Sequence, residues 1–248
     1  LGRRKEYTGP VQVHPIPGFY EPFSTFSHLI GAGVFAGLGA KLLHKARGSK
    51  VRVAYLSVYV FCSVFLLAMS GVYHLLAADT TGRAVLGRLD YAAIFTLIAG
   101  THTPVQGLFF RGVARWLPLA LMWSAVATGV TMFSIYYHDL PRGLGNGVFL
   151  LLGWIAAVSG LVLWKRLGTR PMRLLLGGGV AYSVGALLMG FGWPTLIPGV
   201  IGPHELWHVA VLVGMGLHWR FLYDNAQYPM GPLTRGKPAG IQGPSSPT

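Results

Sequence analysis

The chain has 248 residues, of which 52% are hydrophobic and only 11% are charged. An ordinary soluble domain carries roughly 25% charged residues, so this composition excludes one. The formal net charge of +13 could suggest a nucleic-acid partner. We exclude that partner because the Lys and Arg residues lie between apolar segments, where they set membrane topology and contact lipid headgroups. The composition predicts an integral membrane protein.

In chain order, seven segments are apolar and long enough to cross a bilayer, which takes about 20 residues. They are residues 23–43, 53–77, 90–110, 117–137, 147–164, 174–193 and 204–222. We therefore predict an all-α fold, a seven-transmembrane-helix bundle over residues 23–222. An N-terminal extension, residues 1–22, precedes it, and a disordered Pro/Gly-rich tail, residues 223–248, follows it. Pairs such as Gly33 and Gly37 are expected to let helices pack closely.

Alternating spans place the start of segment 1, the end of segment 2 and the starts of segments 3 and 7 on one side of the membrane. That side carries 6 Lys and Arg residues and the other carries 14. Because positive charge is retained in the cytoplasm, this bias predicts an N-terminus outside it. The single cysteine, Cys62, lies in an apolar run, which excludes an intramolecular disulfide and a thiolate metal site.

Three histidines are expected to meet at one level of the membrane. His204 and His208 lie one helical turn apart at the start of segment 7, so both imidazoles can face one ion. His74, in the last turn of segment 2, is the natural third ligand. Three protein nitrogens that leave one position free are typical of catalytic zinc, whereas a structural site closes with four ligands. The sequence thus predicts a Zn²⁺ cofactor bound by His74, His204 and His208.

Two further polar residues at the same level are candidates for catalysis. Asp90, at the start of segment 3, could orient a ligand histidine or take a proton from water. Ser70 lies one turn before His74 and could hydrogen-bond that water or a substrate oxygen. Each also has a plain structural interpretation, because Asp90 could cap segment 3 and Ser70 could serve only in helix packing.

The stretch "HELWH" also matches the H-E-x-x-H pattern of zinc proteases, in which the Glu is the general base. Only one acid, Asp224, follows it as a potential third ligand, which argues against a protease. Glu205 is therefore expected to complement the helix dipole. His28, at the start of segment 1, could reach the cluster as an outer partner. His102 lies roughly 18 Å along the helix from Asp90, and His218, ten residues past His208, likewise lies near the opposite face, so we exclude both from the metal centre.

The blocks "SGVYH", "LDYAAIFTLIAGTHTP" and "HELWHVAVLVGMGLHW" resemble the signatures of the haemolysin III family. This family is the bacterial branch of the progestin and adipoQ receptors and is distantly related to the alkaline ceramidases. The resemblance covers residues 21–222. It implies seven helices, zinc on the three histidines, and Asp90 and Ser70 around a metal-bound water. It also implies a bacterial inner-membrane location, with the N-terminus and zinc on the cytoplasmic side as in the receptors. Since the charge bias favours the reverse, both orientations stay open.

The leading functional hypothesis is a zinc-dependent hydrolase of a lipid amide within the membrane. Its partner would be a membrane lipid, either a ceramide-like amide or a free fatty acid. Two alternatives remain: a receptor-like or lipid-sensing protein with structural zinc, and a pore-forming haemolysin. The sequence does not indicate an oligomeric state.

Overall fold

The computed structural model describes residues 14–137, 139–141 and 143–228. Seven helices account for most of this part of the chain, as predicted. They are α1 (Pro22–Ala46), α2 (Lys50–Leu75), α3 (Thr81–Phe109), α4 (Val113–Ile135), α5 (Leu144–Leu167), α6 (Thr169–Phe191) and α7 (Pro203–Asp224). The predicted disorder of the tail from residue 229 onward lies outside the described residues.

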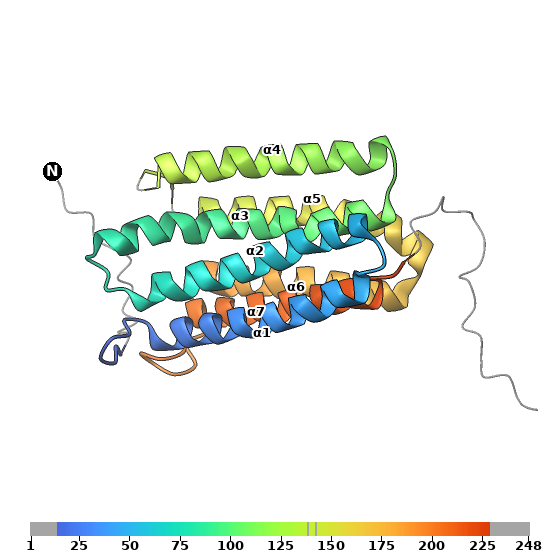
Figure 1. The fold of residues 1–248 in the computed structure, drawn as a ribbon. Coiled ribbons are helices and arrows are strands. Elements are labelled where there is room, and N and C mark those ends of the chain that lie inside the picture. Colours follow the sequence, from blue (N-terminus) through green and yellow to red (C-terminus); the bar gives the residue numbers. More distant parts are fainter. Residues whose placement is uncertain (1–13, 138, 142, 229–248) are drawn as a thin grey trace, which may run out of the picture.

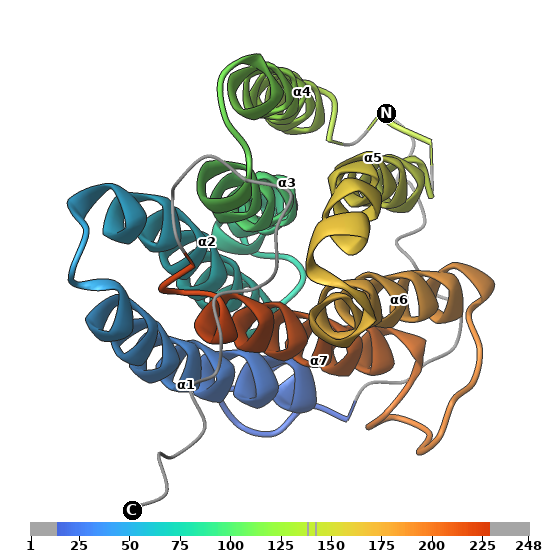
Figure 2. The same ribbon diagram turned by 90° about the vertical axis from the view of Figure 1, so that its right-hand side faces the viewer.

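The helices run side by side along one common axis (Figure 1). Six of them form a closed ring in the order α1, α2, α3, α5, α6 and α7, because each packs against the next and α7 packs against α1. α4 lies outside this ring against α3 (Figure 2). The interior that the ring encloses is therefore built without α4.

Six helices, α1 to α6, are long and apolar enough to cross a membrane. α7 has 22 residues, which makes it about 33 Å long, so length does not set it apart. It is less apolar because it carries several polar side chains, namely His204, Glu205, His208, His218 and Arg220. Helices long and apolar enough to cross a membrane thus lie at six of the seven predicted places.

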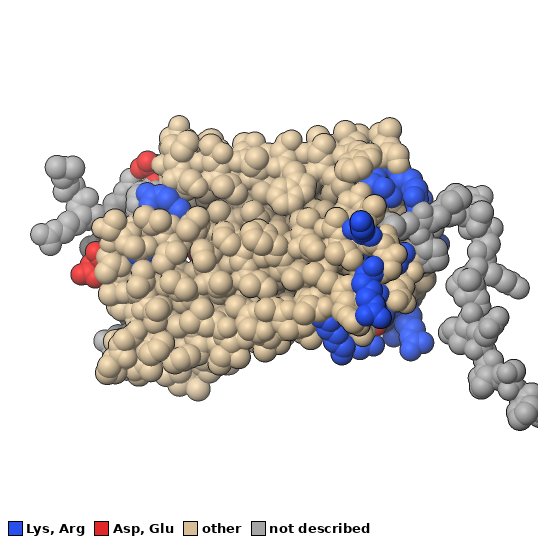
Figure 3. Space-filling view, in the orientation of Figure 1, with Lys and Arg blue, Asp and Glu red and all other residues tan. Residues whose placement is uncertain are grey.

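Charged side chains gather at the ends of the bundle, and the basic ones favour one end (Figure 3). That end holds the α1–α2 loop, the α3–α4 loop and the α5–α6 junction. The basic residues there are the Lys and Arg residues of segments 41–52, 111–115 and 165–173, together with Arg220. The long apolar sides of the bundle are the surfaces that lipid chains would cover.

α3 begins nine residues earlier than predicted, and this changes the position of Asp90. Thr80 caps the helix, since its hydroxyl accepts a hydrogen bond from the backbone N–H of Arg83 at 3.2 Å. Asp90 therefore lies in the third turn of α3, and its interpretation as a capping residue is wrong. Hydropathy missed the first turns because Arg83 and Arg88 lie in them.

The prediction that Gly33 and Gly37 mediate helix packing is also wrong. A Cβ atom added at either glycine would meet nothing within 4 Å. Gly39, two residues farther along the same helix, lies against α2 instead, where a Cβ would come within 2.4 Å of Cγ1 of Val60. Close approach of α1 and α2 thus depends on a glycine outside the Gly-x-x-x-Gly pair.

We expect Gly39→Ala to destabilise the bundle, because the added methyl group pushes Val60 and with it α2. Overpacking of this kind costs about 1–3 kcal/mol. Gly37→Ala is the matched control, and it should be neutral or slightly stabilising because alanine favours helix. Thermal unfolding in detergent measures both. Equal melting temperatures for the two variants would contradict the close approach at Gly39.

Candidate metal centre

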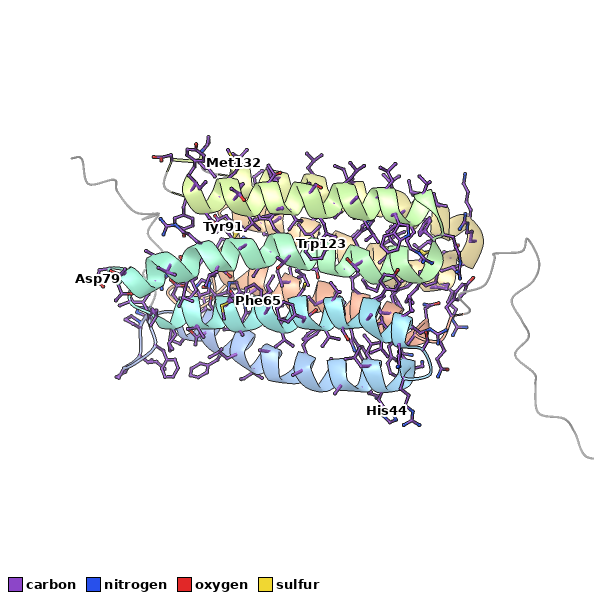
Figure 4. The ribbon with its side chains drawn as sticks, turned by 45° about the horizontal axis from the view of Figure 1, so that its top comes forward. His44, Phe65, Asp79, Tyr91, Trp123 and Met132 are labelled. Carbon is purple, nitrogen blue, oxygen red and sulfur yellow. The ribbon has the colours of Figure 1, made fainter. Side chains whose placement is uncertain are left out.

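His74, His204 and His208 come together at one end of the bundle, as the sequence predicts. Nε2 of His204 lies 3.3 Å from Nε2 of His74 and 3.1 Å from Nε2 of His208. One ligand nitrogen from each residue lies within 4.8 Å of the others, and His74 and His208 are buried. Asp79 marks the same end of the bundle, and His44 marks the opposite one (Figure 4). The group could therefore hold a metal ion.

The spacing of these nitrogens suits zinc. Zinc binds histidine at about 2.0–2.1 Å, so two nitrogens of a tetrahedral site lie roughly 3.3 Å apart. The two Nε2 distances from His204 are close to that value. Neutral imidazoles are ligands that zinc accepts readily, and three of them leave one coordination position for another group. The residues thus fit a three-histidine zinc site.

A carboxylate that the sequence did not predict holds the His74 ring in place. Glu21, directly before α1, accepts a hydrogen bond from Nδ1 of His74, and Arg83 of α3 donates to its other oxygen. A proton held at Nδ1 leaves the Nε2 lone pair of His74 facing the two histidines of α7. Burial alone would raise the pKa of Glu21, but the hydrogen bond from His74 and the charges of His74 and Arg83 outweigh it and lower the pKa to about 2.

Ser70, on α2, and Asp90, on α3, lie next to each other beside the three histidines. Both residues line the same cavity as His204 and His208. The structure therefore brings the two candidate catalytic residues to the metal centre, with Asp90 facing the cavity from the third turn of its helix.

Glu205 is occupied by structural hydrogen bonds. One carboxylate oxygen accepts from the backbone N–H of Gly202 at 2.9 Å, and the other accepts from the Ser24 hydroxyl at 3.1 Å. An acidic side chain that accepts a hydrogen bond from the backbone N–H of the residue before a helix caps the N-terminus of that helix and complements the helix dipole. The structure thus agrees with the capping role, and the Ser24 contact also ties α7 to α1.

His28 lies where the sequence suggested, beside the cluster. Its ring stacks on that of His208 with centroids 3.9 Å apart and an interplanar angle of 18°. It also lines the cavity that the metal centre faces.

The cavity continues from the metal centre along the inside of the ring. Its lining on α7 runs from His204 to His218, which is about 21 Å along the helix. Most of the wall between these ends is apolar and comes from α3, α5, α6 and α7, including Ile94, Leu97, Ile98, Phe149, Leu150, Ala157, Leu176, Ala186 and Val211. A bilayer core of about 30 Å is two lipid chains thick, so the cavity is long enough for one acyl chain.

These features define an integral membrane protein with a helical bundle that encloses an apolar cavity, with a potential metal site at one end. Residues 19–219 match the Haemolysin-III related family, and the chain therefore belongs to the haemolysin III family. It is 35% identical to Hemolysin-3 of Bacillus cereus over 129 residues, 52% of this chain and 56% of that protein. It is 29% identical to the Hemolysin-3 homolog of Bacillus subtilis (strain 168) over 167 residues, 67% of this chain and 75% of that protein.

We expect Glu21→Gln to weaken zinc binding, because an amide is a poorer acceptor for the His74 N–H and no longer offers Arg83 a charge. Loss of such an outer partner typically lowers metal affinity by about 10–100-fold. Competition with a chelator measures the affinity. Asp224→Asn, at the opposite end of α7, is the control and should bind zinc like the wild type. Unchanged affinity in Glu21→Gln would show that the carboxylate does not orient the ligand.

Proposed function

We propose that the protein is a zinc-dependent hydrolase that cleaves the amide bond of a membrane lipid. One observation carries this proposal: His204 and His208 of the three-histidine group line an apolar cavity that Ser70 and Asp90 also line. A structural zinc site needs no such cavity and no free carboxylate beside it. A lipid hydrolase needs both, because the acyl chain must be bound and a proton must be moved.

The residues would divide the reaction as follows. His74, His204 and His208 would hold the ion, which when bound polarises the scissile carbonyl and activates a water molecule. Asp90 accepts the proton of the attacking water and returns it to the leaving nitrogen, so that amide and water give a carboxylic acid and an amine. Ser70 lies beside Asp90 on the wall of the cavity, so we assign its hydroxyl the role of orienting that carboxylate.

The membrane placement follows from how α7 is packed. The polar side chains Glu205, His208 and His218 of this helix are turned into the bundle and are buried. Ionisable groups in a membrane-spanning helix are tolerated when they face such an interior. We therefore propose that α7 is a seventh span and that the protein resides in a bacterial inner membrane. The cavity would then lie at the depth of the lipid chains, where an acyl group can bind.

A second candidate is a receptor-like or lipid-sensing protein whose zinc is structural. The contacts around the site favour it, because the histidines join α2 to α7, Glu21 joins α2 to α3, and Glu205 joins α7 to α1. Removal of zinc from such a centre would separate helices that the ion holds together. This candidate predicts a large loss of thermal stability without zinc and no turnover of any lipid amide.

Asp90→Asn tests the leading proposal. We expect it to abolish cleavage of a ceramide-like amide in detergent, with a loss of at least about 100-fold, because the proton acceptor is gone. Zinc content should equal that of the wild type, since Asp90 is not a ligand. Asp79→Asn, an exposed acid at the same end of the bundle, is the matched control and should keep full activity.

The outcomes separate the two candidates. Cleavage by Asp90→Asn at the wild-type rate would overturn the role of the carboxylate. A wild-type protein that loses stability on chelation of zinc but cleaves no lipid amide would favour the structural centre.

A further inference from the structure

The end of the cavity remote from the metal centre is polar. Gln106, fully buried on α3, donates its amide N–H to Nε2 of His102 at 3.2 Å and to the Ser159 hydroxyl on α5. Its Oε1 atom is also buried and has no hydrogen-bond partner within the described residues. His102 is buried and lines the cavity. A purely apolar pocket would not require this network.

His218 adds a second unpaired acceptor at the same end. Its Nε2 donates to the backbone carbonyl of Leu175 at 3.0 Å, which leaves Nδ1 as an acceptor. Nδ1 is buried and, in the described part of the chain, unpaired. A Cβ added at Gly178 of α6 would clash with Cδ2 and Nε2 of His218. The edge of the His218 ring that carries these two atoms therefore faces α6. The edge with Nδ1 therefore faces away from α6, and His218 lines the cavity.

The two histidines lie at one level of the bundle. α3 and α7 run in the same direction (Figure 1). His102 is twelve residues beyond Asp90, about 18 Å, and His218 is fourteen beyond His204, about 21 Å. The sequence excluded both from the metal centre for this reason. The structure places His102 and His218 in the lining of the cavity that His204 and His208 also line, at the end remote from the metal centre.

The chemistry of these groups selects the ligand. His218 lines the cavity, its Nδ1 is an acceptor, and a buried acceptor without a donor is costly. A carboxylate would bring only further acceptors and negative charge. A hydroxyl group brings a donor and is neutral, so it suits an apolar cavity.

We propose that His218 and His102, which both line this end of the cavity, form a second polar subsite, which binds a hydroxyl group at the distal end of an acyl chain whose head lies at the three histidines. This inference rests on the proposed function, which places the carbonyl end of the acyl chain at the three histidines. It narrows the substrate class to lipids whose acyl chain is about as long as the cavity and is hydroxylated at its far end.

Binding of fatty acids to the zinc-loaded full chain in detergent tests the subsite. Hexadecanoic and 16-hydroxyhexadecanoic acid differ only at the distal end, and we expect the hydroxylated acid to bind at least about fivefold more tightly, the effect of one buried hydrogen bond. Decanoic and 10-hydroxydecanoic acid should show no such preference, because their chains end short of the subsite. This comparison requires no variant and so does not depend on a mutant folding.

Variants then locate the preference. His218→Leu should bring the affinity ratio of the two long acids close to one and leave binding of hexadecanoic acid unchanged. Ser183→Ala is the matched control, because Ser183 lines the middle of the cavity, and it should keep the ratio.

Equal binding of the two long acids by the wild type would show that water satisfies the cluster and would overturn the subsite alone. A preference that persists in His218→Leu would also overturn it. If neither long acid binds, the acyl cavity of the proposed function fails, and the subsite fails with it.

Discussion

The hydrogen bond between His74 and Glu21 fixes the geometry on which the metal centre depends. His74 lies in the last turn of α2 and its ring is buried. Glu21 holds the ring from the start of α1, and Arg83 of α3 holds Glu21. Arg83 also donates to the carbonyl of Leu76 at 2.6 Å, which satisfies a backbone acceptor at the end of α2. Three helix ends are thus locked together before α7 contributes its two histidines.

Much of this arrangement could be predicted because it follows from local periodicity. The i, i+4 spacing of His204 and His208 puts both rings on one helical face, and alternation of spans puts His74 at the same end. Glu21 could not be found in this way. It lies outside the apolar segments, and its partners His74 and Arg83 are 53 and 62 residues away. Only the packed helix ends show that they meet.

Helix boundaries show a second limit of the sequence. A hydropathy pattern cannot include the polar first turns of α3, because a buried arginine counts against a span even when its charge is paired. Arg83 is such a residue, since it is buried against Glu21 and over the ring of Tyr73 at 4.5 Å. The same reasoning explains why α7 is less apolar than its neighbours. Of its polar residues, His204, His208 and His218 line the cavity, whereas Glu205 caps the helix and Arg220 is exposed beside Asp224.

The concentration of basic residues at one end has a consequence for metal supply. The three histidines lie at the other end of the bundle, the end that Asp79 marks (Figure 4). A membrane that retains Lys and Arg on one side holds every copy of the protein in the same orientation. The three-histidine groups of all copies then face a single compartment. A metal ion held by these groups would come from that compartment, so its free metal concentration would determine how much of the protein carries an ion.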